Sequence, residues 1–205
     1  RKHRSRNKLS LFQPLNILEM VVYHKQREGL QRTKEIRCPR PFETIPYHIP
    51  KTSIALFLSE MLSRSLKSPE PQPALYDFIH NAILMLDETQ GKLGNFHLVF
   101  LLELSRFLGF QPATNHDAGH PYFNLTEGTF QNTPGPESLC MNKEISRVFF
   151  AAIQTRLHAL DTLSIPSNLR KTLLQYVIDY FRHHLDGMPE IKSHHVLEMV
   201  LSEKA

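Results

Sequence analysis

The stretch that decides the fold is residues 96–110, FHLVFLLELSRFLGF. Apolar side chains cover nearly every side of a helix drawn through it, and the main interruptions are His97, Glu103 and Arg106. A helix that is apolar all round is either buried in a larger protein or spans a membrane. This stretch is shorter than the roughly 20 apolar residues that a bilayer requires. It therefore predicts a central buried helix, and Gly109 suits the C′ position just past its end.

Amphipathic patterns lie on both sides of this helix. Their apolar residues recur at i, i+3 and i+4, the spacing of one helix face. The segments with this spacing are residues 51–67, 74–89, 142–160, 167–185 and 193–204. Together with the central stretch they predict an all-helical domain of about six helices.

The segment between the central helix and the next one, residues 110–141, loses the helical spacing and is rich in proline and glycine. It contains one alternating piece, YFNLTEGTFQ, at residues 122–131. The dipeptide Glu127-Gly128 in its middle favours a turn. We therefore expect a loop that contains a short β-hairpin.

The first forty residues have a different pattern. Residues 9–24, LSLFQPLNILEMVVYH, are apolar on both parities and contain Pro14, which favours a strand with a bulge over a helix. A turn ending at Gly29 and a second alternating run, residues 30–38, complete a predicted β-hairpin. Two strands alone are marginal in water. Either they pack on the rest of the chain or, as we favour, they belong to a barrel whose first strands lie upstream of Arg1.

The domain organisation follows from these patterns. Four prolines within residues 38–50 predict an extended connector after the hairpin. We assign residues 1–40 to a β part, 41–50 to the connector and 51–205 to the helical domain. The expected fold class is mainly α with a small β part.

Charge is distributed unevenly between these parts. Residues 1–40 hold 11 Lys or Arg and 3 Glu, whereas residues 41–205 hold 13 basic and 17 acidic residues. A basic module beside a mildly acidic body is typical of polyanion binding, because each cation that neutralises a phosphate releases a counterion. The alternatives are a solvated basic terminus or an adaptor whose basic end binds membrane or RNA.

Few residues suggest catalysis. The two cysteines, Cys38 and Cys140, provide no disulfide framework and no four-cysteine zinc site, and they indicate a reducing cytoplasm. Carboxylate pairs such as Asp87-Glu88 stand at a helix end, where solvation explains them.

A metal site is the alternative with the most specific residues. His116, Asp117 and His120 lie in a polar loop and evoke a helical metal-dependent phosphohydrolase. Such a site needs further ligands from other elements, so we expect no metal and no enzyme.

The order of several motifs resembles a known family. RKHRSRNK, LFQPL, LQRTKEI, the proline connector, IALFLSEMLSRSL, FHLVFLLELSRFLGFQP and YFNLTEGTF follow one another as in the bacterial recombination mediator RecO, particularly its Bacteroidetes form. The resemblance implies an N-terminal OB-fold, of which residues 1–40 are the C-terminal part, followed by a helical domain. Some members carry a four-cysteine zinc site in the region of residues 110–142, and this chain lacks those cysteines.

The resemblance also implies a function. RecO proteins are non-catalytic mediators of single-strand gap repair in the RecFOR pathway. They bind single- and double-stranded DNA, anneal strands, engage the single-stranded DNA-binding protein and RecR, and help to load RecA. We expect no cofactor, no membrane association and a cytoplasmic location near the nucleoid.

Site residues follow from the same resemblance. The side chains expected to contact DNA phosphates are Arg1, Lys2, Arg4, Arg6, Lys8, Lys25, Arg27, Arg32, Lys34 and Arg37. The family's helical domain takes the acidic, Phe-ended tail of the single-stranded DNA-binding protein into an apolar groove. The residues expected at this groove are Arg106 and Phe107.

Overall fold

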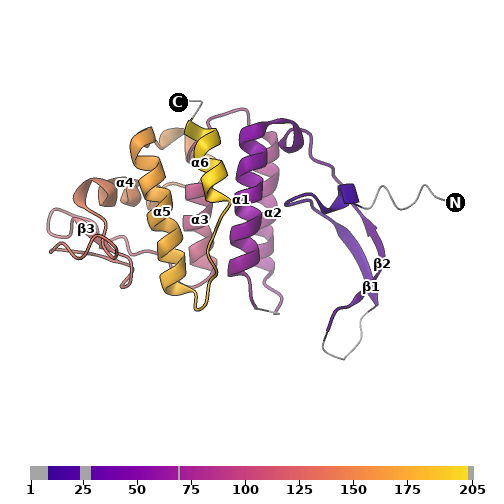
Figure 1. Ribbon diagram of the computed structural model, residues 1–205, viewed down its shortest axis with the longest axis horizontal. Coiled ribbons are helices and arrows are strands. Elements are labelled where there is room, and N and C mark those ends of the chain that lie inside the picture. Colours follow the sequence, from indigo (N-terminus) through magenta and orange to yellow (C-terminus); the bar gives the residue numbers. More distant parts are fainter. Residues whose placement is uncertain (1–8, 24–28, 69, 203–205) are drawn as a thin grey trace.

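A computed structural model describes residues 9–23, 29–68 and 70–202 (Figure 1). In these residues a bundle of helices forms the body, the N-terminal hairpin lies at one end of the long axis, and a second small hairpin lies at the other. The helices are α1 (Ile49–Ser65), α2 (Pro73–Glu88), α3 (Phe96–Phe107), α4 (Lys143–Gln154), α5 (Ser167–His184) and α6 (His194–Ser202). The predicted fold class, mainly α with a small β part and about six helices, is confirmed.

Helix α3 is the centre of the body, as the sequence predicts. Every residue from Phe96 to Leu102 is buried, and α3 packs against α1, α2, α4 and α5. Each large apolar side chain buried in this way stabilises the fold by about 1.5–3 kcal/mol relative to exposure. Gly109 has φ +86°, and the N–H of Phe110 donates to the carbonyl of Ser105 at 3.1 Å. Gly109 is thus the C′ glycine that the sequence predicts.

The prediction of one continuous helix over residues 142–160 is wrong. Helix α4 ends at Gln154, and a separate 3₁₀ segment, η3 (Leu157–Thr162), follows. At the break, the N–H of Leu157 donates to the Glu103 carboxylate of α3 at 2.8 Å. The Thr155 hydroxyl donates to the carbonyl of Ala151 at 2.9 Å. These bonds satisfy backbone groups that a continuous helix would pair internally.

The long loop between α3 and α4 contains the predicted hairpin, β3 (Tyr122–Asn124) and β4 (Thr129–Gln131). Gly128 in its turn has φ +67°, a conformation that glycine adopts without strain. Phe123 is fully buried, and its ring lies 4.5 Å from that of Phe149 in α4 and 5.7 Å from that of Tyr180 in α5. Aromatic packing on α4 and α5 therefore holds this loop.

The N-terminal hairpin consists of β1 (Glu19–Tyr23) and β2 (Arg32–Arg37), paired antiparallel. The strand that the sequence predicts over residues 9–24 is wrong in its first half, which holds a 3₁₀ turn, η1 (Leu9–Phe12), and an irregular segment. Leu15 there has φ +63°, and the Asn16 side-chain amide donates to the carbonyl of Leu11 at 3.0 Å. Together with Pro14, which has no N–H to donate, these features prevent strand pairing before Glu19.

The hairpin stands away from the helices (Figure 1). All five residues of β1 are exposed. Only the preceding segment, through Leu15 and Ile17, packs against the main core. The alternative in which the two strands pack on the rest of the chain is therefore not seen in the described residues.

The connector is less extended than predicted. It contains a 3₁₀ turn, η2 (Ile45–Tyr47), and α1 begins at Ile49, within the segment 41–50 assigned to the connector. Pro50 lies in the first turn of α1, where a missing N–H costs nothing and the fixed φ suits a helix. The proline that was expected to exclude a helix thus begins one.

The last helix packs against the first, and one carboxylate of the first helix also binds the segment just before the last. Glu60 of α1 accepts hydrogen bonds from the N–H of Lys192 (3.1 Å) and from the N–H (2.8 Å) and hydroxyl (2.5 Å) of Ser193, immediately before α6.

Among the described helices, none has the length and apolar character needed to cross a membrane.

Candidate nucleic-acid interface

The β1–β2 hairpin presents two chemically different faces. Cross-strand partners share a face, and successive residues of a strand alternate between faces. One face is mostly polar and carries the pairs Glu19–Arg37, Val21–Glu35 and Tyr23–Arg32. The other is mostly apolar and carries Met20–Ile36 and Val22–Thr33. The register shifts between Val21 and Val22, so Lys34 is the extra residue of a β-bulge and has no cross-strand partner.

Charge is unequal along the polar face. The guanidinium of Arg37 forms an ion pair with Glu19, with Arg37 Nε 2.6 Å from Glu19 Oε2. The second carboxylate, Glu35, lies between them and the turn. Within the described residues Arg32 and Lys34 form no ion pair. The excess positive charge of this face is therefore at its far end.

The predicted DNA contacts fall into two groups. Arg32, Lys34 and Arg37 lie together on β2 and are exposed. The others, Arg1, Lys2, Arg4, Arg6, Lys8, Lys25 and Arg27, lie outside the described residues. Their role stays a prediction.

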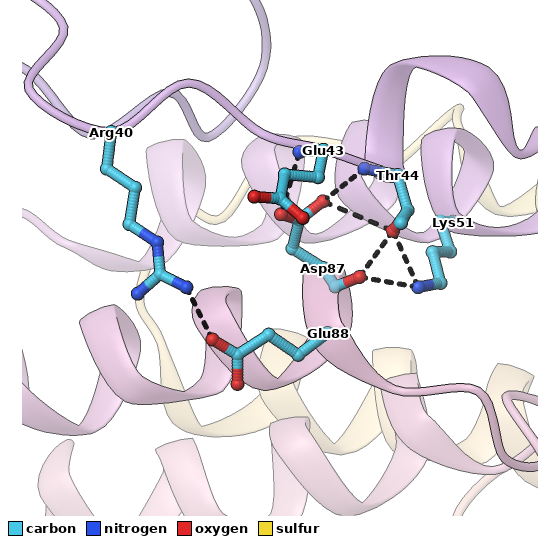
Figure 2. A network of polar contacts seen from close by, with 6 residues as sticks. All are labelled: Arg40, Glu43, Thr44, Lys51, Asp87 and Glu88. Carbon is cyan, nitrogen blue, oxygen red and sulfur yellow. Dashed lines mark hydrogen bonds and ion pairs between the residues drawn. The ribbon is translucent and has the colours of Figure 1, made fainter.

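The connector between hairpin and helices is held by Asp87, at the end of α2 (Figure 2). Its carboxylate accepts the backbone N–H groups of Glu43, Thr44 and Ile45, each at 2.9 Å. Lys51 Nζ donates to the Thr44 hydroxyl and to the carbonyl of Asp87, each at 2.7 Å. We call this cluster, Asp87 with Glu43, Thr44, Ile45 and Lys51, the connector clamp.

Both charged groups of the connector clamp are almost fully covered, Asp87 with 4% and Lys51 with 3% of the residue exposed. Burial by itself raises the pKa of Asp87, but the backbone hydrogen bonds outweigh it and hold that pKa below its usual value. Burial lowers the pKa of Lys51, and Asp87 opposes this shift. The interpretation of Asp87 as a solvated carboxylate is thus wrong, because its partners come from a segment more than forty residues earlier in the chain.

Glu88 next to it does fit the solvated interpretation. It forms an ion pair with Arg40, and both side chains are more than half exposed (Figure 2). Exposed pairs of this kind contribute about 0–1 kcal/mol. The two neighbouring carboxylates therefore have different roles. Asp87 holds the connector in place, whereas Glu88 contributes little to stability.

A groove opens at the end of the bundle where α1 and α3 end and α2 begins, and the segment after α5 completes it. Its apolar lining consists of Leu66, Leu75, Tyr76, Ile79, Phe107, Leu108 and Leu185. The Phe107 ring stacks on that of Phe78 at 5.0 Å and remains 40% exposed. Arg106 is exposed but does not line the groove. Lys67 does line it, and its Nζ donates to the carbonyl of Asp186 at 2.7 Å.

The three residues of the proposed metal site do not converge. The His116 ring packs against Phe130 and Phe150, with centroids 5.0 Å apart in each case. Asp117 and His120 pair with each other instead, with Asp117 Oδ1 2.9 Å from His120 Nδ1. In the described part of the chain no group of three or more His, Cys, Asp or Glu side chains could hold a metal ion. These residues give the phosphohydrolase alternative no support.

Comparisons with known proteins support the family resemblance that the sequence motifs indicate. The family described as "Recombination protein O C terminal" matches residues 47–194. A DNA repair protein RecO from Flavobacterium psychrophilum is 36% identical over 199 residues, covering 97% of this chain and 82% of that protein. The RecO of Flavobacterium johnsoniae is 34% identical over 200 residues, covering 95% of this chain and 80% of that protein. The RecO of Phocaeicola vulgatus is 32% identical over 203 residues, covering 98% of this chain and 84% of that protein.

The matched region begins in η2 and ends at the first residue of α6, so it contains helices α1 to α5 and the groove at the end of the bundle. The relatives extend the similarity across the hairpin as well. The chain belongs to the RecO family of DNA repair and recombination proteins.

Proposed function

We propose that this chain is a non-catalytic, DNA-binding recombination mediator that acts in single-strand gap repair of the RecFOR type. The observation that carries the proposal is the concentration of positive charge in residues 1–40, the part of the sequence that contains the β1–β2 hairpin, which stands apart from the mildly acidic helical body (Figure 1). A polyanion attracted to this end keeps its distance from the acidic surface. Family membership makes DNA the expected polyanion.

The hairpin contributes phosphate contacts in this proposal. Arg32 and Lys34 are exposed cations without a carboxylate partner in the described residues. The proposal assigns further phosphate contacts to basic residues that lie outside the described residues, Arg1, Lys2, Arg4, Arg6, Lys8, Lys25 and Arg27. Contacts of this kind read no bases, so binding is tolerant of sequence. A protein that neutralises two single strands also lowers their mutual repulsion, which favours annealing.

The apolar face of the hairpin suggests how the β part is completed. Met20 and Val22 are 55% and 46% exposed there, and Ile36 stands opposite Met20. An exposed apolar sheet face marks a surface that another element covers. We assign residues 1–40 to the C-terminal part of an OB-fold, with this face toward the barrel interior and the polar face toward DNA.

The helical body supplies partner binding in the same proposal. The groove around Phe107 and Leu75 is mostly apolar; Lys67, Glu70 and Asp186 also line it, and Arg106 is next to Phe107 in the chain. These features suit a peptide that ends in acidic residues and phenylalanine, such as the tail of the single-stranded DNA-binding protein. Contact with RecR and assistance in loading RecA complete the proposed role.

The test is a charge-neutralised variant in which Arg1, Lys2, Arg4, Arg6 and Lys8 are all replaced by Ala. We expect weaker binding to a single-stranded oligonucleotide and a shallower dependence of log affinity on log salt, by about 0.7 for each phosphate that the variant no longer neutralises. The matched control replaces five exposed cations of the helical body, Arg64, Lys92, Arg147, Arg182 and Lys192. If both variants lose affinity and slope equally, or neither does, the N-terminal end is not the DNA interface.

A further inference from the structure

The far end of the polar hairpin face combines an aromatic ring with a cation that has no ion-pair partner among the described residues. Tyr23 is the last residue of β1 and stands opposite Arg32, the first residue of β2. Tyr23 is 50% exposed, and in the described residues its ring contacts no other ring and its hydroxyl no hydrogen-bond partner. The Arg32 side chain is exposed and forms no ion pair there. Both groups are therefore available to a ligand.

The near end of the same face is different. Arg37 is held by Glu19, and the next cross-strand pair adds a second carboxylate, Glu35, opposite Val21. A phosphate brought to this end would meet two carboxylates and one cation that is already paired. Electrostatic attraction for an anionic chain thus increases along the face toward Tyr23.

The geometry of a cross-strand pair matches the chemistry of a nucleotide. Side chains directly opposite each other in an antiparallel pair have Cβ atoms roughly 4.5–5.5 Å apart. A base can stack on an aromatic ring whatever its identity, because every base has a π face. A guanidinium beside that ring can then bind the phosphate of the stacked nucleotide. Lys34, displaced from the ladder by the bulge, offers a second exposed cation two residues along β2.

We propose that Tyr23 is a base-stacking residue for single-stranded nucleic acid, that Arg32 and Lys34 hold the neighbouring phosphates, and that Arg37 takes no part because Glu19 occupies it. This inference rests on the proposed DNA-binding function and adds to it a specific contact. It also divides the cations of β2, which sequence alone treats as equivalent, into two that bind and one that does not.

The experiment compares Tyr23→Leu, Tyr23→Phe and Tyr23→Trp in the full chain. The probes are a 20-nucleotide oligo-dT and an oligomer of the same length that carries abasic sites throughout. Stacking on one ring is worth about 1–3 kcal/mol, so Tyr23→Leu is expected to weaken oligo-dT binding by about 5- to 150-fold. Tyr23→Phe should bind as the wild type does, Tyr23→Trp as tightly or more tightly, and none should differ on the abasic oligomer.

The two arginines form the matched pair of controls. Arg32→Ala is expected to lower the salt slope by about 0.7, the value for one phosphate contact on a single strand. Arg37→Ala should leave that slope unchanged. Equal effects of the two substitutions would overturn the assignment of the phosphate contacts.

The outcomes separate this inference from the function on which it rests. If the wild-type chain binds neither oligomer, the proposed function fails. If it binds both and Tyr23→Leu changes nothing, only the stacking role fails. Weaker binding of the abasic oligomer by Tyr23→Leu also overturns the inference, because it shows damage to the hairpin and not the absence of a stacked base. Retained or improved binding by Tyr23→Trp supports stacking, since a damaged hairpin would not produce it.

Discussion

Helix α3 and strand β1 are both rich in apolar residues, yet they lie in opposite environments. From Phe96 to Leu102 every residue of α3 is buried, whereas every residue of β1, including Met20 and Val21, is exposed. Apolar composition alone therefore does not decide burial. Helix α3 packs against four other helices, whereas in the described residues β1 pairs with β2 and its side chains stay exposed. The difference is consistent with a body built for stability and with the proposed role of the N-terminal hairpin in binding.

The largest expected effect on stability comes from removing a buried side chain at the centre of the helical body. Phe100 has no exposed surface and stacks on Phe78 at 5.2 Å. We expect Phe100→Ala to lower the free energy of unfolding by about 3–5 kcal/mol, because it leaves a cavity that the surrounding helices cannot fill. Urea denaturation followed by circular dichroism measures this change.

The matched substitution near the hairpin is Phe12→Ala, at a side chain that is 63% exposed. It should change the free energy of unfolding by no more than about 0.5 kcal/mol. A comparable cost for the two substitutions would contradict the contrast between a packed body and an open N-terminal end.

The connector clamp joins the two regions, and breaking it is expected to have an intermediate effect. Asp87→Ala leaves the N–H groups of Glu43, Thr44 and Ile45 without their acceptor. The cost is about 1–3 kcal/mol. Hydrogen exchange should accelerate at these three amides and stay slow in α3. Glu88→Gln is the control, since it removes only an exposed ion pair. If hydrogen exchange at the three amides is unchanged in Asp87→Ala, other contacts hold the connector.

The same carboxylate gives the connector clamp a pH dependence. Because the folded-state pKa of Asp87 is below its unfolded value, the stabilisation is fully present above the unfolded pKa, about 3.9. It is lost as the pH falls through the folded value, where the carboxylate takes up a proton. Asp87→Asn should therefore show a smaller loss of stability with acidification than the wild type.

The smallest effect concerns a surface and not the core. Phe107→Ala should weaken binding of a peptide ending in acidic residues and phenylalanine by about tenfold, as expected when one apolar side chain is removed from a groove. Because Phe107 is 40% exposed, the unfolding free energy should change little. Fluorescence anisotropy with a labelled peptide measures the affinity. Tyr47→Ala, at a side chain that is 85% exposed and outside the groove, serves as the control; equal affinity in both variants would exclude the groove.

Sequence reasoning succeeded for several local signals, although not for the strand predicted over residues 9–24. The burial of α3, the C′ role of Gly109 and the hairpin around Gly128 all follow from periodicity or from a single residue's backbone preference. It failed where a distant partner decided the outcome. The helix predicted over residues 142–160 breaks because Glu103 in α3 accepts the N–H of Leu157.

The candidate sites divide in the same way. The predicted DNA contacts Arg32, Lys34 and Arg37 lie on one strand, and of the predicted groove residues Phe107 lines an apolar groove and Arg106 does not; the binding roles stay predictions. The sequence did not reveal that Glu19 pairs with Arg37, or that a bulge sets Lys34 apart. Both facts depend on the register of β1 with β2, and a register is a relation between two strands.

The sequence by itself thus determined the helical body, the position of its central helix, the uneven charge and the family. Each of these depends on residue types or on their spacing along the chain, which require no knowledge of distant neighbours. Tertiary structure alone decided that Asp87 holds the connector, that His116 packs among aromatic rings, and which cations of β2 form no ion pair within the described residues. The reason is physical: the energy of a charged or polar group depends on what surrounds it after folding, and those surroundings come from other parts of the chain.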